Sequence, residues 1–241
     1  RDLSLTALDG QTTYNNIPLI GSYQVDAEGV KVAPQMPLIQ DGVLRNLVND
    51  RIPTATLKTS NGHKILSLSR GNISTSLCIG VIELSGKNKM AYDKLKKKLI
   101  ALAKEEDYEY AYIIPQLVSS NTGIPISDFN VENNYYKPVY VIRISVKDGS
   151  ETIMRLAKVS ALNIKSFKNV IAISSQQQVF NVLLNGRRRE YVSYLQRTAL
   201  SGTPCSLIVP EAILFQELEV EKNTNVILNK PFEVPNPLLE K

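Results

Sequence analysis

Apolar and polar residues alternate along much of this chain, and the alternation predicts a protein built mainly from β-strands. Leu3 to Thr6 and Ile65 to Ser69 each alternate with the period of two that places successive side chains on opposite faces of a sheet. Leu77 to Leu84 is a continuous apolar run of strand length, and Ser85-Gly86 is expected to end it. The N-terminal third therefore predicts strands joined by short turns.

Two turns in this region are specific enough to fix the pairing of their neighbours. Val25 to Val30, VDAEGV, is a polar turn closed by glycine between two apolar runs. Leu38 to Gln40 and Val43-Leu44 flank Asp41-Gly42. Asp-Gly favours a two-residue type I′ turn, because both central residues need a positive φ. We expect a tight hairpin there.

One segment has a helical period instead. Apolar residues recur every three to five positions from Met90 to Leu102, with lysines between them. Asn88 is a suitable N-cap, and the helix is expected to end near Glu106. Tyr108, Tyr110 and Tyr112 then alternate with smaller or polar residues, which predicts a strand that closes at Pro115. We expect a helix–strand element at about 87–114, packed on the sheet.

The C-terminal half returns to strand patterns. Ser119 to Asn134 is rich in Ser, Asn, Gly and Pro and is predicted to be a loop. The predicted strands that follow are Pro138–Val146 and Glu151–Val159, joined at Asp148-Gly149, then Val170–Ile173, Val179–Leu184 and Ser206–Val209. The predicted fold class is mainly β (α+β), an antiparallel sandwich or partly closed barrel with one clear amphipathic helix. We treat 1–241 as a single domain.

Composition narrows the function classes. With 241 residues, 43% hydrophobic and 21% charged, the chain has an ordinary globular composition. No apolar run approaches the roughly 20 residues of a membrane helix, so no membrane partner is expected. The net charge of +5 rests partly on Lys94/Lys96–Lys98 and Arg187–Arg189, which we interpret as solvated faces. We interpret the tyrosines as a half-buried sheet face, and expect no nucleic-acid partner.

The chain offers few groups for catalysis. It contains one histidine, His63, and two cysteines, Cys78 and Cys205, far apart in sequence. A zinc centre needs three or four ligands at suitable spacings, and Ser-His-Asp or Cys-His chemistry needs the same single histidine. GxSxG, P-loop and GxGxxG motifs are missing from the sequence. We therefore assign no catalytic residue in this chain, and expect both cysteines to be buried thiols.

Several motifs together carry a resemblance to a known family. VDAEGV at 25–30, LIQDGVL at 38–44 and NGH at 61–63 are followed by FKNVI at 167–171, GTP at 202–204 with SLIVP at 206–210, and LFQELEV at 214–220. In this order they resemble the C-terminal half of the TldD/PmbA family. These proteins were once called modulators of DNA gyrase, and are now regarded as zinc metallopeptidases. Each motif alone is weak, and their collinear order carries the resemblance.

The resemblance implies that this chain would function together with other segments of a longer protein. The family's metal motif, HExxxH, is expected upstream of Arg1, so the chain alone is expected to be inactive and to hold no zinc. Zinc is expected in the full-length protein. Its partners would be the N-terminal half of the same protein, a like chain or a PmbA-like subunit, and an extended, unfolded peptide. A cytoplasmic location is expected.

Two functional interpretations stay open. The first is the substrate-groove and dimerisation domain of a TldD-like zinc metallopeptidase. The alternative is a noncatalytic PmbA-like partner or scaffold that acts by binding. Whether HExxxH precedes Arg1 would discriminate between them.

The resemblance also suggests candidate site residues. Asn61, Gly62 and His63 form either a peptide-contacting loop or a surface turn with an exposed histidine. In TldD-type members a cysteine near the C-terminus adds a zinc ligand, but the matching region near Arg189 to Tyr191 has none. Cys205 lies later in the chain, and is either a weak candidate ligand or a core thiol.

Overall fold

The protein is described by a computed structural model over residues 2–69, 72–117, 135–136, 138–155, 157–160, 162, 164–184 and 202–222. Strands dominate, and one long helix stands out, so the predicted mainly β class with one clear helix is confirmed. The predicted loop Ser119–Asn134 and the arginines 187–189 lie outside the described residues. No described helix has both the length and the apolar character that a bilayer crossing demands.

Short strands make up most of the chain's regular structure, and the long helix comes near its middle. In chain order the elements are β1 Leu3–Ala7, β2 Thr13–Tyr14, β3 Ile17–Pro18, β4 Met36–Gln40, β5 Val43–Leu44, β6 Lys64–Ser69, β7 Asn72–Leu77, β8 Val81–Gly86, β9 Lys89–Met90, α1 Tyr92–Glu105, β10 Tyr110–Leu117, β11 Tyr135–Tyr136, β12 Pro138–Ser145, β13 Glu151–Met154, β14 Ala157–Ser160, α2 Ile164–Lys168, β15 Val170–Ser174, β16 Gln177–Leu184, β17 Thr203–Pro210, β18 Ile213–Phe215 and β19 Val220–Lys222.

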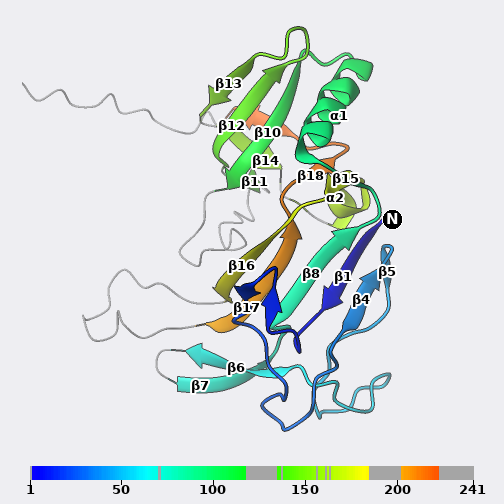
Figure 1. The fold of residues 1–241 in the computed structure, drawn as a ribbon, viewed down its shortest axis with the longest axis vertical. Coiled ribbons are helices and arrows are strands. Elements are labelled where there is room, and N and C mark those ends of the chain that lie inside the picture. Colours follow the sequence, from blue (N-terminus) through cyan, green and yellow to red (C-terminus); the bar gives the residue numbers. More distant parts are fainter. Residues whose placement is uncertain are drawn as a thin grey trace, which may run out of the picture.

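A six-stranded sheet forms the larger part of the fold. Its strand order is β16-β17-β8-β1-β4-β5, and Figure 1 shows these strands side by side in the lower half of the molecule. The predicted hairpin is confirmed at β4 and β5, where Asp41 and Gly42 have φ of 52° and 73°. Leu8, Leu19, Val81 and Ile208 pack together on one part of this sheet.

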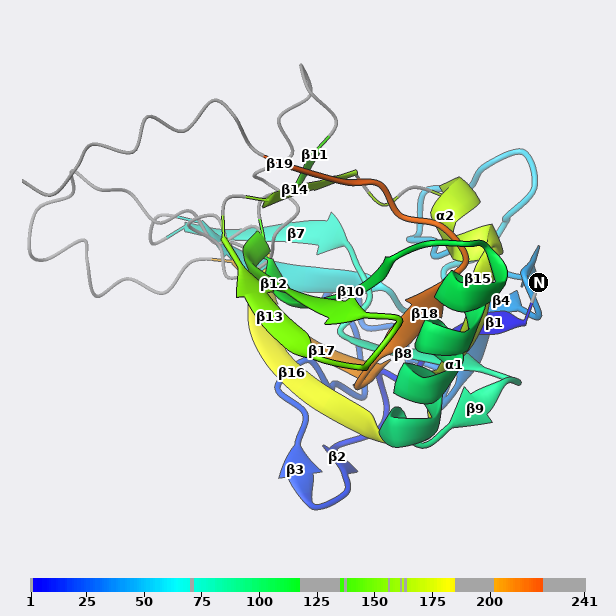
Figure 2. The ribbon, with the colours of Figure 1, turned by 90° about the horizontal axis from the view of Figure 1, so that it is seen from above.

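The helix covers a second, smaller sheet. β10, β12 and β13 form three antiparallel strands above the first sheet, and α1 lies against them (Figure 1). Ala103 of α1 packs with Ala111 and Ile144, while Leu95 packs with Ala172 and Leu214. The helix therefore joins this sheet to β15 and β18. The view from above in Figure 2 shows α1 beside β15 and β18, and the hairpin β6–β7 on the side away from β2 and β3.

The prediction of an antiparallel arrangement needs a correction. Most pairs are antiparallel, but β17 pairs parallel with β8, and β15 pairs parallel with β9. A parallel pair needs a long crossover. The chain supplies one by building α1 and its sheet between β8 and β17.

One strand boundary near residue 80 was predicted wrongly. The apolar run Leu77–Leu84 is not one strand, because β7 ends at Leu77 and β8 begins at Val81. The bend is imposed by a backbone crossing: a Cβ at Gly80 would lie 2.0 Å from the carbonyl oxygen of Gly21. The predicted end of this strand at Ser85-Gly86 is confirmed, since Gly86, which pairs with Leu3, is the last residue of β8.

Two further boundaries around the helix differ from prediction. Asn88 does not cap α1: the helix begins at Tyr92 after Ala91, and no side chain caps it. The Asn88 amide instead donates to Asp2 and to the carbonyl of Ile171. Pro115 does not close the tyrosine strand, because β10 continues to Leu117 across an irregularity in its pairing with β12. The end of α1 near Glu106 is confirmed.

Candidate functional site

The predicted loop at residues 61–63 points into the molecule. His63 is 0% exposed, so its interpretation as an exposed histidine on a surface turn is wrong. Its Nδ1 lies 2.9 Å from Oδ1 of Asn61, and its Nε2 lies 3.1 Å from Oδ2 of Asp9. Gly62 has a φ of +80° and its carbonyl accepts a hydrogen bond of 2.9 Å from the hydroxyl of Tyr23.

The bonds of Asn61 define the protonation of the histidine ring. Oδ1 of Asn61 also accepts from the backbone N–H of Asn49 at 2.8 Å, while Nδ2 donates to the carbonyl of Leu47 at 2.8 Å. This amide orientation makes Nδ1 of His63 the donor to Oδ1. Nε2 is then left to face the carboxyl group of Asp9.

Asp9 is the other half of this arrangement. It is 1% exposed, and its Oδ1 accepts from the backbone N–H groups of Gly80 and Val81 at 2.5 and 2.9 Å. Oδ2 is close to His63 Nε2, but the two atoms are not aligned as a hydrogen bond and have no other partner in the described structure. The two atoms therefore face each other, enclosed by protein, with their hydrogen-bonding capacity unused.

We define the buried hub as Asp9, Tyr23, Asn61 and His63. Burial, reinforced by the negative charge of Asp9, raises the pKa of Tyr23, so its hydroxyl stays a neutral donor. The hub joins the segment after β1, the segment after β3 that contains Tyr23, the segment before β6 and the start of β8. Because its bonds run within the chain, its first role is to hold these four segments together.

The two cysteines lie beside the hub. Cys205, on β17, is 1% exposed, and Cys78 is partly exposed; neither forms a disulfide. Burial raises the pKa of both thiols, that of Cys205 to about 12. The expectation of a buried thiol is therefore confirmed for Cys205 and is wrong for Cys78, which is only partly buried.

These residues do not fit a zinc centre. Every histidine and cysteine of the chain falls within the described part, where no three His, Cys, Asp or Glu groups are placed to hold a metal. A cysteine that binds zinc must be a thiolate, and burial of the Cys205 thiol opposes that form. His63 has both ring nitrogens directed at protein groups. We derive no chemical step through a metal in this chain.

The accessible features lie elsewhere, and the first is a sheet edge. β16 ends the six-stranded sheet, pairs with β17 over all eight of its residues, and has no described strand on its outer side (Figure 1). Asn181 anchors it, because its amide donates to the carbonyl of Pro18 at 2.8 Å and accepts from the Ser206 hydroxyl at 2.7 Å. Phe180 is 48% exposed. The edge is therefore preformed and partly apolar.

The second accessible feature is the hairpin β6–β7. Cross-strand partners share a face, so Lys64 and Leu77 lie on the same side as Leu66 and Thr75. On this face Leu66 and Leu77 are exposed, as is Ile73 farther along β7. Lys64 is paired with Asp50 at 2.7 Å. We name Leu66, Ile73 and Leu77 the hairpin face; it is apolar and its one lysine is neutralised.

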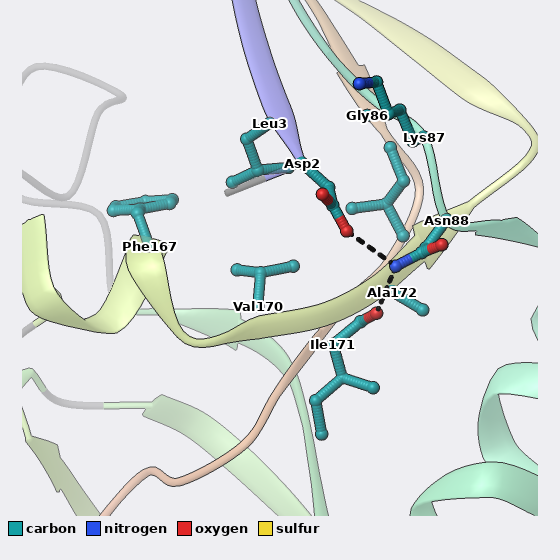
Figure 3. A pocket seen from close by; sticks show the side chains of 10 residues that line it. Asp2, Leu3, Gly86, Lys87, Asn88, Phe167, Val170, Ile171 and Ala172 are labelled. Carbon is teal, nitrogen blue, oxygen red and sulfur yellow. Dashed lines mark hydrogen bonds between the residues drawn. The ribbon is translucent and has the colours of Figure 1, made fainter. Parts of the chain in front are cut away.

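The third feature is the small pocket in Figure 3. It lies where β1 begins, β8 ends and β15 passes, and Phe167 and Val170 form its apolar side. Its polar groups are engaged: Asn88 Nδ2 donates to Asp2 at 2.8 Å, and Lys87 pairs with Asp41 at 2.9 Å. This pocket presents little chemistry for a ligand.

Sequence reasoning identified part of this arrangement. It selected Asn61, Gly62 and His63, which the structure does bring together, but their contact with a peptide stays a prediction. It missed Asp9 and Tyr23, which no motif marks. It also missed that Cys78 and Cys205 converge, since their separation in sequence gave no sign of it.

A mainly β domain with a buried polar hub, and with a sheet edge that no other described strand covers, is thus the class defined by the fold. A scan of protein-family models and a search of curated proteins gave no match. Among solved structures, TldE from Thermococcus kodakarensis is similar with a TM-score of 0.49 and 13% identity, covering 86% of this chain and 37% of that one. A protein named as a modulator of DNA gyrase from Bacteroides thetaiotaomicron VPI-5482 gives a TM-score of 0.43 and 14% identity, with 92% and 37% coverage.

Both names belong to the family that the sequence motifs resemble. The chain spans about 37% of the length of each of these proteins. Activity, substrate and partners of those longer proteins are not carried over to this chain.

Proposed function

We propose that this chain is the C-terminal substrate-groove and dimerisation domain of a TldD-like zinc metallopeptidase that cleaves extended, unfolded peptides. The chain supplies binding surfaces, and the metal and its ligands come from another segment. The motif order in the sequence supports the family. The outer edge of β16, beside which the described residues place no further strand, is the observation that carries the binding role.

An exposed strand edge recognises extended chains through their backbone. The outward-facing N–H and C=O groups along β16, beside which no other described strand lies, can add a peptide as a further strand, which depends little on the peptide's sequence. Phe180 offers an apolar contact beside that edge. A folded substrate has no free backbone to offer, so unfolded peptides are the ligands that this surface favours.

The hairpin face supports the dimerisation role. An isolated two-stranded sheet is marginal in water, and its apolar side favours coverage by another polypeptide. Leu66, Ile73 and Leu77 expose 55%, 70% and 45% of their surfaces. Their coverage in an assembly would remove this apolar area from water.

The peptide-binding role can be tested by changing the backbone of the peptide ligand, so that the protein itself stays unaltered. We compare one extended peptide with two versions that are N-methylated at alternate residues, using fluorescence anisotropy. N-methylation removes backbone donors. Alternate N–H groups of an added strand point toward β16 and away from it, so methylation of one set should weaken binding at least tenfold, whereas methylation of the other should weaken it much less. Equal binding of all three peptides would exclude strand addition.

A photo-crosslinker locates the edge. Placed at Phe180 on β16, it should capture the peptide, whereas the matched control at Ile153, exposed on the edge strand β13, should not. Capture only at Ile153 would place the peptide-binding surface on the sheet of β10, β12 and β13.

The second candidate is a noncatalytic PmbA-like partner that binds without cleaving. The buried positions of His63 and Cys205 support this partner role as well as they support the peptidase domain, because neither side chain is available to a substrate. Zinc analysis and peptide cleavage by the full-length protein separate the two. One zinc per chain with cleavage supports the peptidase, and peptide binding with neither supports the partner.

A further inference from the structure

The thiols of Cys78 and Cys205 meet at one backbone oxygen. Sγ of Cys78 lies 3.6 Å and Sγ of Cys205 lies 3.5 Å from the carbonyl oxygen of Ile79. Two atoms that each lie this close to a third cannot be farther apart than twice that distance. The fold thus gathers the chain's two sulfurs around a single atom, although 126 residues separate Cys205 from Ile79 in sequence.

The strand register explains this meeting. β8 and β17 run parallel with Ser206 opposite Val81, and the Ser206 N–H donates to the carbonyl of Gly80 at 2.7 Å. Cys205 precedes Ser206, and Cys78 precedes the bend at Ile79-Gly80, so both side chains reach the same bend. The bend itself is held by Asp9, which accepts from the N–H groups of Gly80 and Val81.

We propose that Cys78 and Cys205 form an oxidisable dithiol site that takes up a peroxide-class oxidant and closes to an intramolecular disulfide. Cys78 is the attacking residue because it is the partly exposed thiol, while Cys205 is enclosed. A disulfide needs its sulfurs about 2.05 Å apart. In the proposed reaction both side chains rotate away from the shared carbonyl to reach this distance.

The steps balance with hydrogen peroxide as the oxidant. The Cys78 thiolate attacks one peroxide oxygen, the S–O bond forms as the O–O bond breaks, and the departing hydroxide takes a proton to become water. The Cys205 sulfur then attacks Cys78 Sγ. The S–S bond forms, the S–O bond breaks, and the second hydroxide leaves with the Cys205 proton as water. Two thiols lose two hydrogens, and one peroxide becomes two waters.

The environment makes this bond slow to form and slow to reduce. Burial raises the pKa of Cys78, which lowers the fraction of attacking thiolate at neutral pH. It raises that of Cys205 as well, and a thiol of high pKa is a poor leaving group when a reductant attacks the disulfide. Once closed, the bond would tie the β7–β8 bend to β17 and so couple the hairpin β6–β7 to the six-stranded sheet.

Intact mass spectrometry tests the site. The purified chain is incubated with hydrogen peroxide at pH 8, alkylated with iodoacetamide under denaturing conditions, and measured with and without prior reduction. We expect the loss of two hydrogens, no alkylation before reduction, two alkylations after it, and a linked peptide pair containing residues 78 and 205. Two alkylations after oxidation, or a species linked between chains, would overturn the proposal.

Two variants make the assignment specific. In Cys78→Ser the remaining Cys205 should stay alkylatable after peroxide, because it is enclosed and has lost its partner. In Cys205→Ser the remaining Cys78 should gain oxygen, since no resolving thiol is present. Oxygen added to Cys205 in the first variant would show that Cys78 is not the attacking residue. An unmodified Cys78 in the second would show that peroxide does not reach it, and would refute the site.

Discussion

The crossing of Gly21 and Gly80 gives the sharpest test of the fold. A Cβ at Gly21 would lie 1.9 Å from the Gly80 carbonyl oxygen, 2.5 Å from its carbonyl carbon and 2.9 Å from the nitrogen of Ser206. All three are backbone atoms, so no flexible side chain can move aside. Gly21→Ala must open the crossing from 1.9 Å to the 3.4 Å at which ordinary contact begins.

The cost follows from the bonds that this opening breaks. Gly80 accepts from the Ser206 N–H at 2.7 Å and donates to Asp9 at 2.5 Å, and the Gly21 N–H donates to the Ser206 hydroxyl at 3.1 Å. A buried partner left unbonded costs about 1–3 kcal/mol, so three such losses amount to roughly 3–9 kcal/mol. Total stabilities are about 5–15 kcal/mol, so Gly21→Ala should abolish most of the folded population at moderate urea concentrations.

Urea unfolding followed by far-UV circular dichroism measures this cost. The control is Gly149→Ala, where φ is +72° but nothing lies within 4 Å, so only the left-handed backbone is strained, at about 1–2 kcal/mol. Gly80→Ala should resemble Gly21→Ala, and the double variant should cost little more than the larger single one, because both block the same contact. The reasoning fails if Gly21→Ala loses no more stability than Gly149→Ala.

Two further predictions concern the buried hub and the thiol beside it. Asp9→Ala should lower the free energy of unfolding by about 3–5 kcal/mol, because two buried N–H groups and the buried His63 ring lose their partner. Asp9→Asn should lower it by only about 1 kcal/mol, since the new amide can donate to Nε2 of His63. Equal losses in urea unfolding would show that the contact between Asp9 and His63 contributes nothing to stability. For Cys205, a pKa raised from 9.0 to about 12 means that the unfolded chain releases its proton first, so stability is complete below pH 9 and falls as the pH rises toward about 12. Cys205→Ala should show a shallower fall over that range, and an unchanged slope would exclude the thiol as its source.

Local patterns predicted the parts of the fold that local forces determine. Asp41-Gly42 specified its own hairpin, because the turn conformation depends on those two residues alone. The lysine-rich helix ended near Glu106 as its period indicated. The strand of alternating tyrosines was also found, since β10 contains Tyr110 and Tyr112.

Errors arose where distant segments intervene. Asn88 has the pattern of a helix cap, but Asp2 and the carbonyl of Ile171 occupy its amide. The run Leu77–Leu84 has the pattern of one strand, yet Gly21 crosses the chain at Gly80. The hub could not be foreseen, because Asp9 stands in an ordinary turn sequence and becomes the partner of His63 only in the folded chain.

The parallel pairing of β8 with β17 bears on the order in which the chain can fold. The helix α1 and the strands β10, β12 and β13 are close in sequence, so their contacts close short loops and can form early. The pairing of Val81 with Ser206 has to close a far longer loop before it gains any contact. We therefore expect a rapid folding phase that assembles α1 with β10, β12 and β13, and a slow phase in which β17 enters the larger sheet. The thiols of Cys78 and Cys205 come together only in the slow phase.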